Sequence, residues 1–250
     1  MPTVEKIYEY LNNMAPFERQ ESFDNAGFLV GRKDQEVSAI LVALDLTPEV
    51  IQEARELGVQ LIVTHHPVIF HAIKNVTNQD VLGRKLRALV ACDISVICMH
   101  TNLDVSGGGV NDVLIKKMGV KRVEGIVRQT GSGGVYNTAY GLGRFGTLEE
   151  PMEPMAFAEM VKKNLDAKAL RVCPGPNPVR KVAVCGGSGG DMLQEVIDLE
   201  CDTYVTADVK YDQFLEAAAM GIKTVTWIKT GCVITCHGGP GAFGIVGSVE

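Results

Sequence analysis

The feature that most constrains the fold is an alternation of apolar runs and helical patterns between residues 37 and 99. Residues 37–44, 59–64 and 94–99 are apolar and rich in β-branched side chains, and the intervening segments place apolar residues at helical spacing. Strands that alternate with helices pair in parallel, since each crossover returns the chain to the same edge of the sheet. The sequence therefore predicts an α/β fold.

Helix boundary signals support this pattern. Thr47, Pro48 and Glu49 form a typical helix start, and Gly58 closes that helix. A second helix is predicted over residues 80–92. An amphipathic helix is also predicted over residues 3–14, ahead of a turn into a short strand near residue 28.

Polar residues follow the predicted strands at the points where they end. Asp45 follows the first strand, His65 and His66 follow the second, and His100 and Asp104 follow the third. Parallel strands direct their carboxyl ends to one edge, where α/β proteins bind ligands. A buried imidazole needs a hydrogen-bond or metal partner. We therefore predict a metal site at this edge. The alternative is a structural domain whose strands end in polar residues by coincidence.

Composition narrows the class of protein. The chain has 250 residues, of which 46% are hydrophobic, and this is enough to form the core of one large domain or of two lobes. Its net charge is −6. Basic residues are scattered, so nucleic-acid binding is not indicated. Apolar runs fall far short of the roughly 20 residues that span a bilayer. Residues 1–20 show no signal-peptide pattern. We expect a cytoplasmic protein without a membrane partner.

The seven cysteines are odd in number, and several lie in apolar segments. This usage predicts reduced, buried thiols rather than a disulfide framework. Cys232, Cys236 and His237 offer an alternative metal site, but their spacing does not match a zinc finger or ribbon.

The second half of the chain changes character near Gly125. Residues 125–147 suggest antiparallel hairpins, and residues 154–165 suggest a helix. The alternation then returns, with strands at 179–185 and 203–206 and helices at 191–199 and 211–220. We predict a first lobe of residues 1–124 with 221–250, which carries the metal site, and a second lobe of residues 125–220.

Two glycine-rich segments, residues 107–109 and 186–190, precede predicted helices. Such loops can hold a phosphate on backbone N–H groups. The first lacks the lysine and hydroxyl of a Walker loop, and the second lacks the G-x-G-x-x-G spacing. A structural turn is the favoured interpretation of both.

The order of the motifs resembles the GTP cyclohydrolase I type 2 homologues, also called the Nif-three-like family. The resemblance runs from about residue 4 to 221. It is carried by five segments: Asp24-Asn25-Ala26-Gly27, Thr64-His65-His66-Pro67, His100-Thr101-Asn102-Leu103-Asp104, Gly186-Gly187-Ser188-Gly189 and Thr206-Ala207-Asp208-Val209-Lys210. It implies a two-lobed α/β fold with mixed and parallel sheets flanked by helices. The chain looks like the short form without an inserted domain, and the resemblance implies assembly into a toroidal homohexamer.

The resemblance also implies a dinuclear metal site and a hydrolytic activity. His65, His66 and Asp104 look like metal ligands, and His100 looks like a further ligand or close neighbour. Two divalent ions are implied, with zinc, iron, manganese and nickel not distinguished. The family name implies opening of a purine ring, so the expected partner is a small molecule, possibly a nucleotide. Asp24, Asp45 and Asp208 are candidate acids for proton transfer or ligand support.

The tail departs from the family pattern. Family members usually complete the site with a glycine-histidine segment and a glutamate four residues after that histidine. Residues 222–250 contain no H-x-x-x-E, and His237 is followed by glycines. This departure keeps a second function open, a metal-binding regulatory or interaction protein with little turnover.

Overall fold

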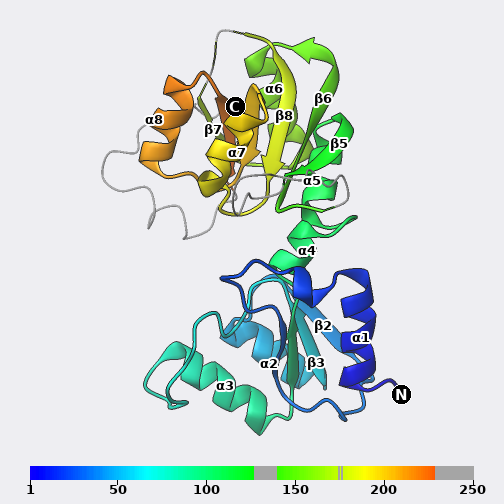
Figure 1. The fold of residues 1–250 in the computed structure, drawn as a ribbon. Helices are drawn as coiled ribbons and strands as arrows, with labels where there is room; N and C mark the ends of the chain where they lie inside the picture. Colours follow the sequence, from blue (N-terminus) through cyan, green and yellow to red (C-terminus); the bar gives the residue numbers. More distant parts are fainter. Residues whose placement is uncertain (127–139, 174, 176, 229–250) are drawn as a thin grey trace. The chain divides into compact units, whose positions relative to one another are not determined.

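The computed structural model describes residues 1–126, 140–173, 175 and 177–228 (Figure 1). The chain divides into two compact units, of which the first comprises Met1–Ser106 and the second begins at Gly107. No helix among the described residues combines the length and apolarity needed to cross a bilayer.

The first unit is built on a four-stranded sheet with the order β1-β4-β3-β2. Strands β2 (Ile40–Ala43), β3 (Leu61–Thr64) and β4 (Ser95–Cys98) are parallel, as the alternation predicts. Strand β1 (Gly27–Val30) adds to β4 in the antiparallel sense. The sheet is therefore mixed, with its three parallel strands ending at one edge.

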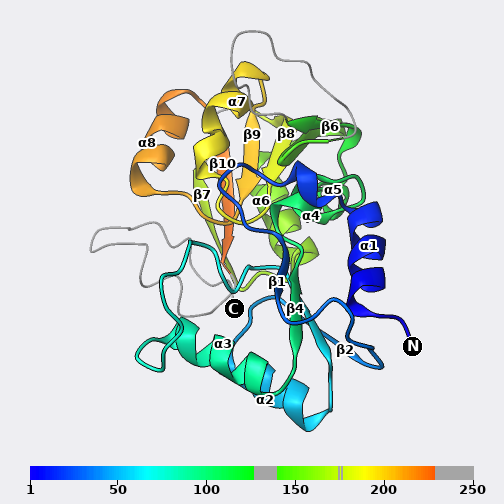
Figure 2. The same cartoon turned by 60° about the horizontal axis from the view of Figure 1, so that its bottom comes forward.

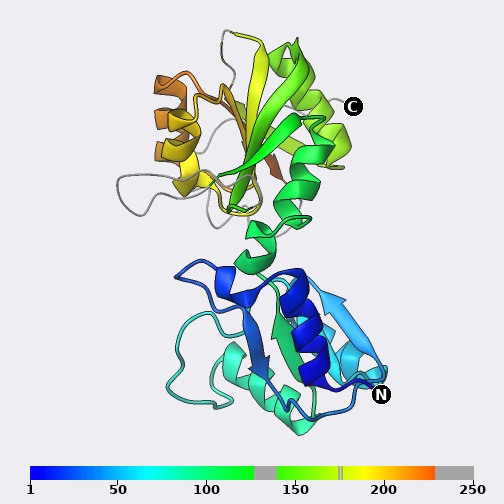
Figure 3. The same ribbon diagram turned by 45° about the vertical axis from the view of Figure 1, so that its right-hand side comes forward.

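Helices cover both faces of this sheet (Figures 2 and 3). Helix α1 (Val4–Met14) lies on one face, and α2 (Pro48–Glu56) and α3 (Val81–Ala91) lie on the other. Side-chain oxygens of three residues accept from the first-turn N–H groups of these helices, which confirms the predicted starts: Thr3, Thr47 and Asp80. The short helices η1 (Phe17–Arg19) and α4 (Thr101–Val105) complete the unit.

The apolar strand pattern follows from burial on both faces. Leu61 of β3 packs in the core under α1, whereas its neighbour Ile62 packs under α2 and α3. In β4 the same alternation places Val96 under α2 and α3, and Ile97 under α1. A strand covered on both sides is apolar at successive positions, and this explains the continuous runs in the sequence.

The second unit is built on a six-stranded sheet with the order β5-β6-β8-β9-β10-β7. Strands β8, β9 and β10 are parallel, and β5, β6 and β7 pair in the antiparallel sense. The bounds of the strands are β5 Lys121–Ile126, β6 Gly143–Met152, β7 Ala169–Cys173, β8 Val179–Cys185, β9 Thr203–Thr206 and β10 Lys223–Ile228. The helices are α5 Val110–Lys117, α6 Pro154–Asn164, η2 Gly190–Met192, α7 Leu193–Asp198 and α8 Tyr211–Ala219.

The boundary between the units differs from the predicted division into residues 1–124 with 221–250 and residues 125–220. Strand β5 precedes Gly125 for most of its length, yet it pairs with β6 in the second sheet. Strand β10 follows Gly221 and pairs with β9 and β7 in the same sheet. Backbone pairing therefore assigns both segments to the second unit. Residues 229–250 lie outside the described part of the chain.

Several elements were missed or mispredicted. Helix α4 and strands β7 and β10 were not predicted, and the strand predicted over residues 37–44 is reduced to Ile40–Ala43. The predicted hairpin character of residues 125–147 is confirmed for β5 and β6, which pair in the antiparallel sense. Residues 127–139 between them lie outside the described part.

The glycine loop at 186–190 is a packed strand-to-helix turn. A Cβ atom at Gly189 would lie 2.4 Å from the hydroxyl of Tyr204, and one at Gly190 would lie 2.0 Å from the Gln213 amide. The N–H of Gly189 donates to Thr206, and that of Gly186 donates to Asn111. Close packing therefore accounts for Gly189, and the positive φ of Gly187 (65°) accounts for that glycine, which agrees with the structural interpretation.

Candidate metal centre

Two parallel strands bring three histidines together at the carboxyl edge of the first sheet. His65 and His66 directly follow β3, and His100 lies two residues beyond the end of β4. The backbone N–H groups of His65 and His66 donate to the carbonyls of Ala43 and Leu44, at 3.2 and 2.9 Å. These bonds extend the β2–β3 pairing and fix the backbone positions of His65 and His66.

The three rings lie close together, tilted or edge-on to one another. Their centroids are 5.1 Å apart for His65 and His66, 5.2 Å for His65 and His100, and 5.6 Å for His66 and His100. One ring nitrogen of each lies within 4.8 Å of the other two. In the part of the chain that the structure describes, this is the one cluster of three or more such side chains with metal-binding spacing.

The Nδ1 atom of His65 is engaged by the backbone. It lies 2.7 Å from the carbonyl oxygen of Met99, which can only accept. Nδ1 of His65 therefore carries the proton, and Nε2 keeps its lone pair for a ligand. Burial, the largest effect, lowers the pKa of His65 despite the opposing hydrogen bond to Met99. A neutral imidazole is the form that binds metal.

The other two histidines are oriented by carboxylates. Nδ1 of His66 lies 2.7 Å from Oδ1 of Asp45, and Nδ1 of His100 lies 2.7 Å from Oδ1 of Asp24. Carboxylates paired with the Nδ1 atom of a histidine fix its tautomer and the orientation of its ring. All three rings are thus prepared to present Nε2 to the same space.

Asp24 is the more firmly held of the two acids. Its carboxylate accepts from the backbone N–H of Thr101 at 3.0 Å, from the Thr101 hydroxyl, and from the N–H of Asn25 at 2.7 Å. Burial by itself raises the pKa of Asp24, but the bonds from His100, Thr101 and Asn25 together outweigh it and lower the pKa to about 2. Asp24 is therefore ionised and acts as a fixed negative charge behind His100.

Asp104 supplies a carboxylate beside the rings. Its Oδ1 lies 3.8 Å from Nε2 of His65, and its side chain is 14% exposed. Burial, the largest effect, and the charge on Asp24 raise the pKa of Asp104 while His100 opposes them, and the net result is a pKa of about 7. A bound divalent cation would favour the ionised form of such a carboxyl.

The donor set fits a divalent transition metal. Three imidazole nitrogens with one carboxylate suit zinc, iron, manganese or nickel, and each imidazole carries the hydrogen-bonded partner that metal-binding histidines need on their other nitrogen. His65, His66, His100 and Asp104 are the residues that would hold the ion.

Two predicted acids remain to be placed. Asp45 follows β2 by two residues, is 57% exposed and reaches the centre through its contact with Nδ1 of His66. Asp208 is exposed in the second unit, after β9, and its N–H donates to the carbonyl of Gly187. Cys232, Cys236 and His237 lie outside the described residues.

Three groups that shape the centre were not predicted from the sequence. Thr101 binds Asp24 through two groups, and the carbonyl of Met99 orients His65. The side-chain amide of Asn25 donates to the carbonyl of Ile69 at 2.6 Å and holds the loop after the paired histidines. Thr101 and Asn25 lie inside motifs already noted, so their positions were a usable signal. A backbone carbonyl leaves no such signal.

Comparison with known proteins places the chain in one family. The sequence model of DUF34/NIF3 (NGG1p interacting factor 3) matches residues 2–229. A "GTP cyclohydrolase 1 type 2 homolog" from Clostridium perfringens is 35% identical over 217 residues, which cover 86% of this chain and 81% of the relative.

Solved structures agree with this result. The crystal structure of Staphylococcus aureus protein SA1388 has a TM-score of 0.79 at 30% identity, covering 90% of this chain and 85% of that protein. A Bacillus cereus protein related to NIF3 has a TM-score of 0.80 at 25% identity, covering 90% and 87%. The chain therefore belongs to the DUF34/NIF3 family, in agreement with the resemblance in its motifs and with its two-unit α/β fold.

Proposed function

We propose that this protein is a divalent-metal-dependent hydrolase whose substrate is a small molecule of the purine nucleotide class. The observation that carries the proposal is the geometry of His65, His66 and His100, whose Nδ1 atoms are all engaged at 2.7 Å while one nitrogen of each ring lies within 4.8 Å of the others. The relatives named GTP cyclohydrolase 1 type 2 homologue support a purine ring-opening reaction.

A divalent metal held by these residues supplies Lewis acidity and a water of lowered pKa. The chain supplies position and charge. Asp24 holds the His100 ring with a buried negative charge, and the Met99 carbonyl sets the tautomer of His65. Asp45 is exposed and paired with His66, so we assign proton exchange with solvent to its carboxylate.

Two further features of the proposal come from the family resemblance. We propose a second metal ion in the same centre and assembly of six copies into a ring. Sedimentation velocity tests the assembly, because a hexamer of 27.0 kDa chains is readily separated from a monomer or dimer.

The experiment for catalysis incubates GTP with protein supplied in turn with zinc, iron, manganese or nickel. Loss of the purine absorbance together with formate release would support ring opening. The His100→Ala variant should lose this activity, and His71→Gln is the matched control, because His71 is an exposed histidine outside the cluster. Equal turnover by His100→Ala and the parent would contradict the proposal.

The second candidate is a metal-binding regulatory or interaction protein with little turnover. The absence of an H-x-x-x-E segment from the chain favours it, because family members usually complete the centre with those two residues. Tight metal binding that depends on His65, without GTP turnover under any of the four metals, would select this second function.

A further inference from the structure

A groove between α2 and α3 is separate from the histidine centre. Both helices connect parallel strands on the same face of the first sheet, so they run side by side in the same direction. A cavity of about 380 Å³ lies between them. Its apolar lining comes from Pro48 and Ile51 of α2 and from Val81 and Ala88 of α3.

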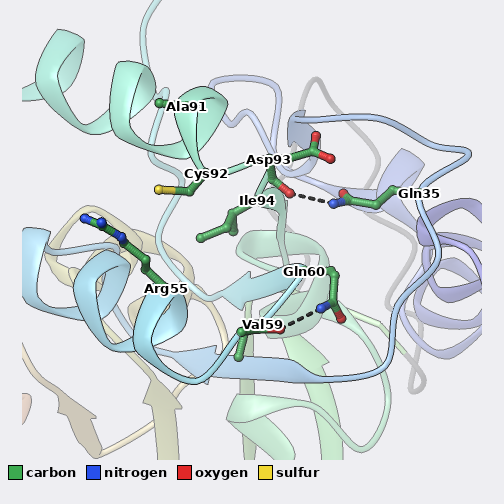
Figure 4. A pocket seen from close by; sticks show the side chains of 9 residues that line it. Gln35, Arg55, Val59, Gln60, Ala91, Cys92, Asp93 and Ile94 are labelled. Atoms are coloured by element: carbon green, nitrogen blue, oxygen red, sulfur yellow. Dashed lines mark hydrogen bonds between the residues drawn. The ribbon is translucent and has the colours of Figure 1, made fainter.

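The groove adjoins a second cavity of about 620 Å³ at the amino-terminal ends of β3 and β4. Arg55 and Cys92 line both cavities, so the two spaces meet at these side chains. In Figure 4 the side chains of Arg55 and Cys92 point to the same side of this second cavity. The histidines lie at the carboxyl ends of the same strands, at the opposite edge of the sheet.

The groove is cationic in an otherwise acidic protein. Arg55, Arg84 and Lys85 line it, no acid among the described residues does, and the chain as a whole carries a charge of −6. Arg84 donates to the carbonyl of Asn78 at 3.1 Å and makes no ion pair with a described residue. Within the described residues, Arg55 makes no ion pair or side-chain hydrogen bond.

Lys85 has a weak acidic neighbour. That neighbour is Glu49. The pKa of Glu49 is lowered mainly by a hydrogen bond from the hydroxyl of Thr47 and, to a smaller extent, by the charge of Lys85. Glu49 is fully exposed and does not line the groove. The two arginines therefore provide most of the positive charge that is free to meet a ligand.

We propose that the α2–α3 groove binds a small organic anion that has an apolar body, with the body between Ile51, Val81 and Ala88 and the acidic head near Arg55 and Arg84. The volume lies in the range of about 300–1,000 Å³ that small-molecule sites usually have. An anion without an apolar body would leave the apolar side chains of the groove exposed to water. A neutral apolar molecule would leave the guanidinium groups without a partner.

The test uses 1-anilinonaphthalene-8-sulfonate as a fluorescent probe and octanoate, octanol and inorganic phosphate as competitors. Octanoate should displace the probe at concentrations at least about tenfold lower than octanol or phosphate, because only octanoate has both the charge and the body. Equal displacement by octanoate and octanol would overturn the role of the cations.

Variants locate the binding. The double change Arg55→Gln and Arg84→Gln should weaken octanoate binding about tenfold, because it removes two charge-assisted contacts. Arg87→Gln is the matched control, since Arg87 is an exposed arginine of α3 that does not line the groove. A double variant that binds octanoate as tightly as the control would overturn the proposal.

Two further measurements test whether octanoate binds in the groove itself and whether a second copy of the chain occupies the groove instead. Octanoate should slow alkylation of Cys92, read by peptide mass spectrometry, because this half-buried thiol lines the groove. The Ala88→Phe variant should lose octanoate binding and keep the sedimentation coefficient of the parent. A changed sedimentation coefficient in that variant, with no probe binding by the parent, would assign the groove to a second copy of the chain and overturn the proposal.

Discussion

Oδ1 of Asp24 lies 2.7 Å from Nδ1 of His100, and no part of the Asp24 side chain is exposed. The two residues are far apart in sequence, and they meet because β1 pairs with β4 and leaves both at the same edge of the sheet. The carboxylate is also fixed by Thr101 and Asn25, so it cannot follow the ring if the ring turns. This buried pair sets the direction in which His100 presents Nε2.

The Asp24→Asn variant should bind divalent metal about 10- to 100-fold more weakly than the parent, because loss of a carboxylate behind a metal-binding histidine has this typical cost. The measurement is a titration against a chelator of known affinity. Asp34→Asn is the control, as Asp34 is exposed on the loop after β1. Equal affinities in the two variants would show that Asp24 does not support the centre.

Asp24 should also make the metal-free protein less stable in acid. Its folded pKa of about 2 lies below the ordinary value of 3.8, so its contribution is present above pH 3.8 and is lost as the pH falls toward 2. We expect about 1 kcal/mol of this contribution to be lost between pH 6 and pH 3. Urea unfolding at both pH values measures it, and the Asp24→Asn variant should lack this part of the pH dependence.

The hydroxyl of Thr224 is buried without a hydrogen-bond partner among the described residues. Thr224→Val should therefore raise the free energy of unfolding by about 1 kcal/mol, since it replaces an unpaired polar group with a methyl of similar size. Thr203→Val is the matched control. The Thr203 hydroxyl is buried and donates to Asp202 at 2.7 Å, so its removal should destabilise by a similar amount. Destabilisation by both changes would contradict the assignment at Thr224.

Burial raises the pKa of the Cys201 thiol to about 12. The thiolate is the reactive form, so Cys201 should resist iodoacetamide at pH 8 in the folded protein and react when the chain is unfolded in urea. Peptide mass spectrometry reads the modification at each cysteine. Half-buried Cys92 is the internal reference and should react faster in the folded protein.

The α/β pattern of the first unit could be predicted because each buried strand is apolar on both faces and each helix has a local start signal. Ile62 and Val96 meet one set of helices while Leu61 and Ile97 meet α1, and Thr47 and Asp80 cap as expected. Strand β10 was not predicted because its threonines and lysine are polar residues, which usually lie on the surface. Thr224, Thr226 and Lys223 are all buried, although their types suggest exposure.

The candidate site was predictable in its side chains and less so in its supports. His65, His66 and His100 follow strand ends, and parallel pairing brings them together. The group that orients His65 is the backbone carbonyl of Met99, which no residue type in the sequence marks. The bond from the N–H of Thr101 to Asp24 depends on the start of α4 at Thr101, which was not predicted. The metal ions, the substrate and the role of Asp208 stay predictions.

The most direct test of the metal centre is the metal content per chain, measured by elemental analysis on protein purified without chelators or a histidine tag. We expect about one to two divalent ions per chain in the parent and in His71→Gln, and a large loss in a His65→Ala, His100→Ala double variant. A parent without bound metal, or a double variant with the metal content of the parent, would contradict a metal centre at these histidines.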